Sequence, residues 1–224
     1  MPEAIANQVS IHYQITGSGP PLLFLHGLGS SGRDWENQVE QSSEDNTVIT
    51  IDFRGHRQSA KPPGPYSIPL FASDVWGVLD EIDIGPVAVV GISEDPGAVE
   101  EDDRSFHRHE KDGRGPRGGL FPDEDMVEER ATLIERWAEN DKDAYRDAFQ
   151  AILDWEGVRE QRASREKPML VVASDGDYVA VEAKQPFNDL MPAAQMVVIE
   201  NAHHAVPVER PERFNEVLDE FLSS

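Results

Sequence analysis

Short apolar runs alternate with helical segments along most of this chain, and this alternation is the feature that most constrains its fold. Strands are expected at 9–15, 22–25, 48–51, 86–90, 169–173 and 196–199. Helical segments are expected between and after them, at 33–44, 69–82, 181–191 and 211–222. Buried strands separated by helices are typical of a mostly parallel sheet with helices on both faces. We therefore predict an α/β fold.

The composition divides the chain into four segments. Residues 1–93 and 166–224 contain the alternation and are expected to form the two halves of one core, while 120–165 contains two helical patterns within 123–156. Apart from glycine and proline, the apolar residues of the segment 94–119 are only Ala98, Val99 and Phe106. The rest of that segment is acidic or rich in Arg, Gly and His, so neither a strand nor an amphipathic helix is predicted there.

The chain is strongly acidic, with 43 Asp and Glu residues against 20 Lys and Arg residues and a net charge of −23. This sign opposes binding to nucleic acid and to anionic membrane surfaces, so neither is an expected partner. Two interpretations stay open: a solvated acidic surface, or adaptation to molar salt, where counterions screen self-repulsion. The low lysine content, 5 residues against 15 arginines, together with the many acidic residues, resembles the composition of proteins from salt-loving archaea. This composition favours a halophile.

The absence of certain residues and segments excludes several classes of protein. There is no cysteine, which excludes disulfides, thiolate nucleophiles and Cys-ligated metals. No apolar segment approaches the ~20 residues that span a bilayer, and no signal-peptide pattern begins the chain. We therefore expect a soluble, cytoplasmic protein. His107 and His109 lack a third ligand and are interpreted as solvated loop residues, so no metal or cofactor is predicted.

Ser93 directly follows a predicted buried strand, in the sequence Gly91-Ile92-Ser93. In a nucleophile elbow, the serine lies on a strained strand-to-helix turn that needs small residues two positions before it and two after it. Gly91 meets the first requirement, but Asp95 stands at the second position. By itself, this pattern also fits a serine that caps a helix.

Asp177 and His204 stand in the same relation to later strands, since they follow the predicted strands 169–173 and 196–199. The carboxyl ends of parallel strands meet at one edge of a sheet, where clefts form. Taken alone, Asp177 fits a turn and His204 fits a hydrogen-bonded loop. Together with Ser93, they form a candidate catalytic triad at that edge.

Three further stretches resemble motifs of the α/β-hydrolase fold family. His26-Gly27-Leu28-Gly29 is similar to its oxyanion-loop motif, and residues 52–59 are similar to its Asp-x-Arg-Gly-His-Gly-x-Ser segment, with Arg57 in place of a glycine. Residues 203–212 resemble its histidine loop and the helix behind it. The family also carries its triad in the order Ser, Asp, His. The resemblance covers 1–93 and 120–224 and is strongest to 3-oxoadipate enol-lactonases and related small esterases.

The resemblance implies a serine hydrolase that acts on a small carboxylic ester or lactone. Ser93 is expected to attack the carbonyl and His204 to take its proton, while Asp177 orients the imidazole. Asp177 is preferred over Asp175 because the family's acid is the fourth residue of that turn. A haloalkane dehalogenase of this fold would carry an aspartate at the position of Ser93.

The same resemblance implies roles for the surrounding loops. The backbone N–H groups of Leu28 and Glu94 are expected to bind the oxyanion. His56 is expected to brace the loop structurally. Residues 120–165 stand where the family inserts a helical cap, here a truncated one. A cofactor-free peroxidase of this fold usually has methionine where this chain has Glu94.

The segment 94–119 brings in a second hypothesis. In the family, the serine begins a helix, and an interior strand follows before the cap, but no such strand is predicted here. Closing that gap would move Asp177 and His204 toward Ser93 by ~4.8 Å, far more than triad catalysis tolerates. The chain is therefore either a working hydrolase or a non-catalytic member of the family, such as a binding module.

A related hypothesis is that 94–119 does not represent the ancestral reading frame, because its composition differs abruptly from both flanks. Resequencing the gene and translating the other frames tests this. Neither a specific substrate nor an oligomeric state follows from the sequence.

Overall fold

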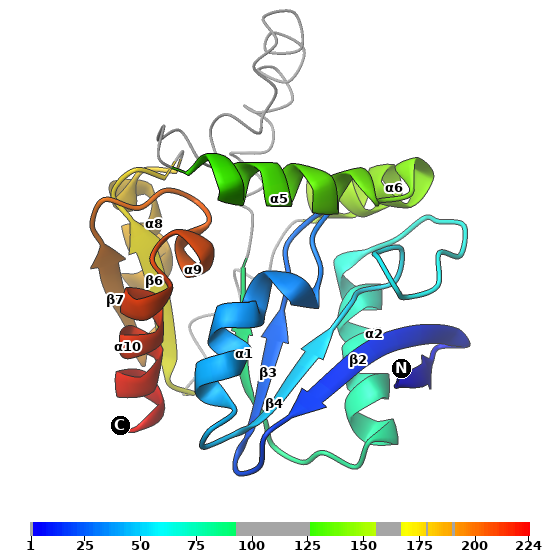
Figure 1. The fold of residues 1–224 in the computed structure, drawn as a ribbon, viewed down its shortest axis with the longest axis horizontal. Helices are drawn as coiled ribbons and strands as arrows, with labels where there is room; N and C mark the ends of the chain where they lie inside the picture. Colours follow the sequence, from blue (N-terminus) through cyan, green and yellow to red (C-terminus); the bar gives the residue numbers. More distant parts are fainter. Residues whose placement is uncertain (1, 93–125, 156–166, 178, 190) are drawn as a thin grey trace, which may run out of the picture. The chain divides into compact units, whose positions relative to one another are not determined.

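The computed structural model describes residues 2–92, 126–155, 167–177, 179–189 and 191–224 (Figure 1). The chain divides into two compact units, Met1–Pro96 with Ala131–Trp155, and Gly97–Arg130 with Glu156–Ser224. Each unit has a sheet of its own, five-stranded in the first and two-stranded in the second.

The sheet of the first unit has the order β1-β2-β4-β3-β5. Its strands are β1 (Glu3–Ala6), β2 (Val9–Thr16), β3 (Pro21–Leu25), β4 (Thr47–Ile51) and β5 (Ala88–Gly91). The β1–β2 and β2–β4 pairs are antiparallel, whereas β3 pairs in parallel with both β4 and β5. The loops that follow β3, β4 and β5 therefore leave the sheet at the same edge.

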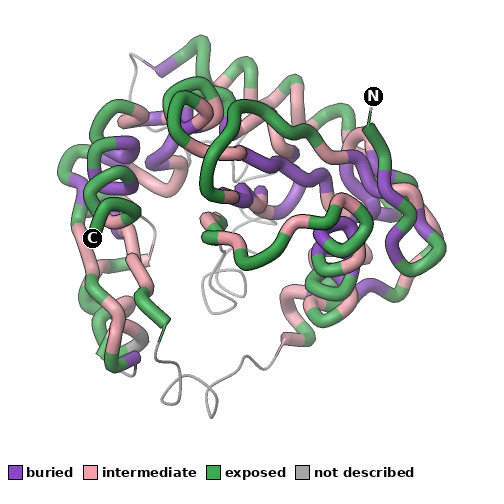
Figure 2. Tube along the Cα trace, turned by 90° about the horizontal axis from the view of Figure 1, so that it is seen from below, coloured by how far each residue is buried: buried purple, intermediate pink, exposed green. Residues whose placement is uncertain are grey.

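Helices cover both faces of this sheet (Figure 1). They are the 3-10 helix η1 (Gly32–Trp35), α1 (Glu36–Ser42) and α2 (Ile68–Glu81). Because successive side chains of a strand point to opposite faces, Leu23 packs into the core formed with α2, while Phe24 stacks on Trp35 with ring centroids 4.8 Å apart. The three central residues of β3 and all residues of β4 but the first are buried; buried stretches of the chain are purple in Figure 2.

Two further helices, α5 (Val127–Ala138) and α6 (Lys142–Leu153), confirm the helical patterns predicted within 123–156. Asp141 caps α6, since its carboxylate accepts hydrogen bonds from two backbone N–H groups of the first turn, each 3.0 Å long. The small side chains of Ala144, Ala148 and Ala151 form its buried face, which packs in one cluster with Leu28. The helix α6 is thereby packed against the loop that follows β3.

In the second unit, β6 (Met169–Ser174) and β7 (Ala194–Ile199) pair in parallel along six residues. The helix α8 (Val181–Asp189) connects them, and α9 (Val206–Glu209) and α10 (Pro211–Leu222) follow β7. Because the two strands run in parallel, they end at the same edge. The loop after β6 and the loop after β7 therefore lie side by side.

The predicted α/β fold is confirmed, and the predicted strands and helices agree with the structure to within two residues at their ends. One strand, β1, was not predicted, because four residues are too few to show a clear alternation. The segment 94–119, for which no strand was predicted where the family has an interior one, lies outside the described residues. Among the residues that are described, no helix combines the length and the apolarity needed to cross a membrane.

Candidate active site

Three of the five predicted site residues lie within the described part of the chain. Asp177 and His204 lie in the second unit, on the loops after β6 and β7, and their side chains are in contact. Leu28 lies in the first unit, on the loop after β3. Ser93 and Glu94 lie outside the described residues. The structure therefore brings together the predicted acid and the predicted base.

The acid–base pair is shielded from solvent. Nδ1 of His204 lies 3.2 Å from Oδ1 of Asp177, and the two side chains are 12% and 8% exposed. Because a carboxylate only accepts, the His204 proton is on Nδ1, the tautomer in which Nε2 can take a proton from a nucleophile. Asp175, the alternative acid, accepts a hydrogen bond from the backbone N–H of Ala202 instead (3.4 Å).

Contacts between the two loops hold this pair in place. The Gly176 N–H donates to the Ala202 carbonyl (2.9 Å), and the Ser174 hydroxyl donates to the His203 carbonyl (2.5 Å). A Cβ on Gly176 would lie 2.8 Å from both the Ala202 oxygen and the His203 ring. Glycine at this position therefore permits the close approach that aligns acid and base.

Glu209, at the end of α9, is a site residue that the sequence did not reveal. Its side chain is fully buried, and its carboxylate accepts hydrogen bonds from the N–H groups of His203 (2.9 Å) and Ala205 (3.0 Å). These two residues flank His204, so Glu209 fixes the backbone on both sides of the predicted base. The only sequence signal was its place within the 203–212 motif, which does not single out this carboxylate.

Lys184 of α8 is a second site residue that the sequence did not reveal. Its Nζ donates to Oδ2 of Asp177 at 2.5 Å. Burial raises the pKa of Asp177, but hydrogen bonds and charges from His204 and Lys184 outweigh burial and lower that pKa to about 2. Asp177 is therefore ionised at neutral pH. Nothing in the sequence pattern pairs these residues, which lie seven positions apart.

The Leu28 N–H belongs to a peptide group whose direction is fixed. The Gly27 carbonyl, on the other side of that peptide bond, accepts hydrogen bonds from Nδ1 of His26 (2.7 Å) and from the Ser30 N–H (3.3 Å). In a trans peptide the N–H points opposite to the carbonyl. Within the described part of the chain, this N–H has no hydrogen-bond partner. Its geometry thus suits a donor to an oxyanion.

Two buried histidines hold this loop, which is the bracing role predicted for His56. Nε2 of His26 accepts from the Phe53 N–H (3.0 Å), and Nε2 of His56 accepts from the Gly29 N–H (3.3 Å). Nδ1 of His56 faces the Arg54 carbonyl (3.1 Å). Because N–H groups only donate and carbonyls only accept, both rings are neutral and carry their proton on Nδ1. Burial lowers the pKa of His26 to about 4 and that of His56 to about 3.

These two histidines make the fold sensitive to acid. Their pKa values lie below the ordinary 6.5, so the unfolded chain binds more protons than the folded chain between about pH 6.5 and pH 4. The stabilisation is complete above pH 6.5 and is lost as the pH falls through that window. We expect the free energy of unfolding to fall there by at most about 1.4 kcal/mol per pH unit for each histidine.

Urea unfolding at constant ionic strength, repeated from pH 7.5 to pH 4.5, measures this loss. The pKa of Asp177 is lowered as well, but its contribution is lost only below its ordinary 3.8. Above pH 4 the loss that comes from the histidines is therefore measured without that of Asp177. An unfolding free energy that stays constant between pH 7 and pH 5 would show that the two imidazoles are not buried as neutral groups.

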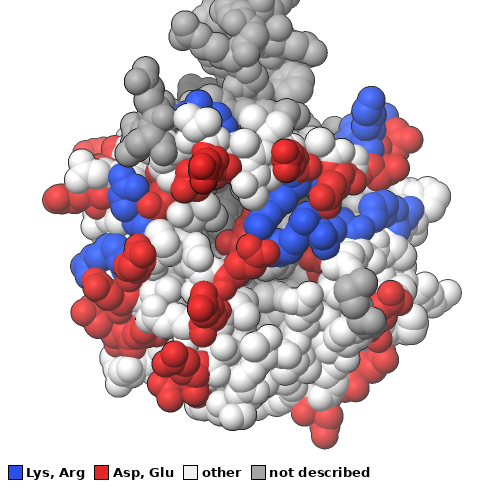
Figure 3. Space-filling view, in the orientation of Figure 1, with Lys and Arg blue, Asp and Glu red and all other residues white. Residues whose placement is uncertain are grey.

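The turn between α5 and α6 also reaches the loop of Leu28. The side-chain amide of Asn140 donates to the Gly29 carbonyl (2.6 Å), and Arg136 pairs with Asp34 (3.1 Å) and Glu36 (2.8 Å). Figure 3 shows such basic side chains lying among the acidic ones that are spread over this face. Gly29 therefore has its N–H held by one histidine and its carbonyl held by the helical segment.

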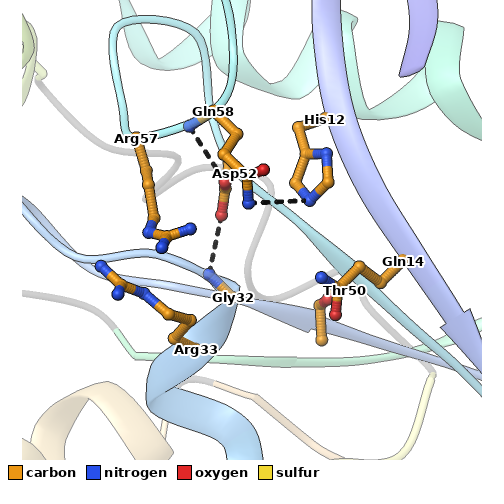
Figure 4. A pocket seen from close by; sticks show the side chains of 8 residues that line it. All are labelled: His12, Gln14, Gly32, Arg33, Thr50, Asp52, Arg57 and Gln58. Carbon is orange, nitrogen blue, oxygen red and sulfur yellow. Dashed lines mark hydrogen bonds between the residues drawn. The ribbon is translucent and has the colours of Figure 1, made fainter. Parts of the chain in front are cut away.

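Residues 52–59 support this loop from the next strand. The Asp52 carboxylate accepts hydrogen bonds from the N–H groups of Gly32 (2.9 Å) and Gln58 (3.3 Å), as Figure 4 shows. The polar cavity beside them measures about 20 Å³, which is too small for an ester or lactone. Arg57, where the resembled motif has a glycine, has a φ of +33°, in the left-handed region that favours glycine.

Comparison with known proteins agrees with these motifs. A family model described as the alpha/beta hydrolase fold matches residues 20–93. The 3-oxoadipate enol-lactonase 2 of Acinetobacter baylyi is 34% identical over 90 residues, which make up 39% of this chain and 34% of that protein. The chain spans about a quarter to a third of the length of the curated relatives that it matches.

Solved structures match nearly the whole chain, and Est816 and an enol-lactonase are two of them. Est816, reported as an N-acyl homoserine lactone degrading enzyme, is 28% identical, with 98% of this chain and 100% of that chain covered and a TM-score of 0.81. The enol-lactonase from Burkholderia xenovorans LB400 is 22% identical, with 100% of both chains covered and a TM-score of 0.85. The chain therefore has the α/β-hydrolase fold, and part of it is similar in sequence to an enol-lactonase of that fold.

Proposed function

We propose that the protein is a serine hydrolase that cleaves a small carboxylic ester or lactone. The observation that carries this proposal is the Asp177–His204 pair, in which a shielded carboxylate holds Nδ1 of an imidazole at the ends of two parallel strands. The resemblance to lactone-cleaving proteins supports the same class of substrate.

In the proposed reaction, Oγ of Ser93 attacks the carbonyl carbon while Nε2 of His204 takes the hydroxyl proton. Asp177 stabilises the imidazolium that forms. The N–H groups of Leu28 and Glu94 bind the tetrahedral oxyanion, a contribution of roughly 2.7–4 kcal/mol per donor in comparable sites. His204 then protonates the leaving alcohol, and water, activated by the same imidazole, releases the acid. In a lactone, the alcohol and the acid remain one molecule.

A fluorophosphonate probe tests the proposal, because it reacts covalently with an activated serine. We expect the wild-type chain to be labelled in both low and high KCl, and Ser93→Ala to lose the label. Ser223→Ala, which removes an exposed serine near the end of α10, is the matched control and should label like the wild type.

The alternative is a retained fold without catalysis, which the acidic Glu94 and Asp95 beside the serine favour. A wild-type chain that gives a folded circular dichroism spectrum and never labels would support this alternative and overturn the proposal. Labelling that persists in Ser93→Ala would show that another nucleophile reacts. Hydrolysis of a panel of short esters and lactones then ranks the substrates.

A further inference from the structure

The carboxylate of Asp177 has a side-chain partner on each oxygen, and its Oδ1 also accepts a longer hydrogen bond from the Val179 N–H (3.4 Å). Oδ1 faces Nδ1 of His204, and Oδ2 accepts a hydrogen bond from Nζ of Lys184 at 2.5 Å. The lysine side chain is 21% exposed and the aspartate side chain 8%, so the pair is largely shielded from solvent. An ammonium this close cancels much of the negative charge that the imidazole experiences.

We propose that Lys184 is a positioning residue that tunes the acid–base pair. It fixes the carboxylate by binding the oxygen that His204 does not use, and its positive charge weakens the attraction between Asp177 and a protonated His204. Removing this charge should therefore strengthen the hold of Asp177 on a protonated imidazole. This inference rests on the proposed function, in which Asp177 and His204 act as acid and base.

Other charged groups near His204 in this unit are already engaged elsewhere. Glu209 of α9 is occupied by the backbone N–H groups of His203 and Ala205 and by the His203 ring. Asp175 accepts a hydrogen bond from the Ala202 N–H. Among the described residues, the charged and titratable side chains on the adjoining loops and helices include Lys184, Asp175, His203 and Glu209. Among these, Lys184 is the cation that contacts the Asp177 carboxylate.

Two roles of Lys184 lead to different expected results: it could be part of a purely structural ion pair, or its charge could tune the acid–base pair. Loss of a structural pair lowers the stability of the fold and the amount of active protein at every pH. Loss of a tuning charge also moves the pH at which His204 titrates. The midpoint of the pH–rate profile is therefore the decisive measurement, and the maximal rate is secondary.

The test compares Lys184→Met, which removes the charge, with Lys184→Arg, which keeps it, and with Lys142→Met, which removes an exposed lysine on α6. The rate of fluorophosphonate labelling is measured against pH. We expect the midpoint of the acid limb to rise by about one pH unit in Lys184→Met. Lys184→Arg and Lys142→Met should keep the wild-type midpoint. Lys184→Gln serves as a second neutral variant if the methionine variant does not fold.

NMR titration of the His204 ring in the Ser93→Ala background gives the same midpoint without any reaction. A signal identified by its loss in His204→Gln is followed from pH 4 to pH 9, with and without Lys184→Met. A midpoint that does not move in either neutral variant overturns the role of Lys184, even if the wild type labels. A midpoint that moves in a protein that never labels supports the tuning contact and overturns the proposed function.

Discussion

Asp177→Asn is expected to lower kcat/KM about 10⁴-fold, as the equivalent change does in triads of this type. The geometry of this site makes asparagine a poor substitute, because both oxygens of Asp177 accept from donors, Nδ1 of His204 and Nζ of Lys184. The amide has only one acceptor, so its NH₂ group must face one of those donors. The imidazole then loses either its orientation or its tautomer.

Steady-state hydrolysis of an activated ester measures the change, with folded protein verified by circular dichroism. Asp175→Asn is the matched control, because it makes the same isosteric change two residues earlier, at a carboxylate that bonds to Ala202 instead of His204. The control should retain most of the activity. Equal losses in the two variants would contradict the assignment of Asp177 as the acid.

Asp74→Ala is expected to lower the free energy of unfolding by about 3–5 kcal/mol, the usual cost of removing one partner from a buried ion pair. Asp74 of α2 is 1% exposed and binds Arg54 through two hydrogen bonds, of 2.5 and 2.6 Å. It also accepts from the Asn7 amide (2.8 Å). Without Asp74, the guanidinium of Arg54 is left buried without its counter-charge.

Urea denaturation followed by tryptophan fluorescence gives the unfolding free energy. Asp80→Ala removes an exposed aspartate from the same helix and should change it by less than about 0.5 kcal/mol. The double variant Arg54→Met/Asp74→Leu replaces the pair with apolar side chains and should recover much of the loss. A single variant as stable as the wild type would contradict the buried pairing.

The sequence predicted the elements of this fold well, because its apolar runs are dense and end abruptly at polar or glycine residues. It also placed Asp177 and His204 together, since they follow strands that pair in parallel. The strand β1 was missed because its four residues are too few to show a clear alternation.

The supporting residues could not be predicted in the same way. Glu209 and Lys184 act through hydrogen bonds between a helix and a loop, and those depend on how the helix is rotated against the loop. Helical rotation shows only weakly in a pattern of apolar residues. Asn140 is a still harder case, because its partner Gly29 lies 111 positions earlier in the chain. The position of Ser93, which was predicted as the nucleophile, stays a prediction.

The hydrogen bond between Asn140 and the Gly29 carbonyl has a consequence for engineering. Exchanging the α5–α6 segment for that of a relative would test the cap role predicted for residues 120–165. Such a graft would also remove the amide that holds the loop of Leu28, and with it the packing of Tyr145 against Gly29. Under the proposed function, a chimaera should therefore retain Asn140 and Tyr145, so that the loop carrying the predicted oxyanion donor keeps its position.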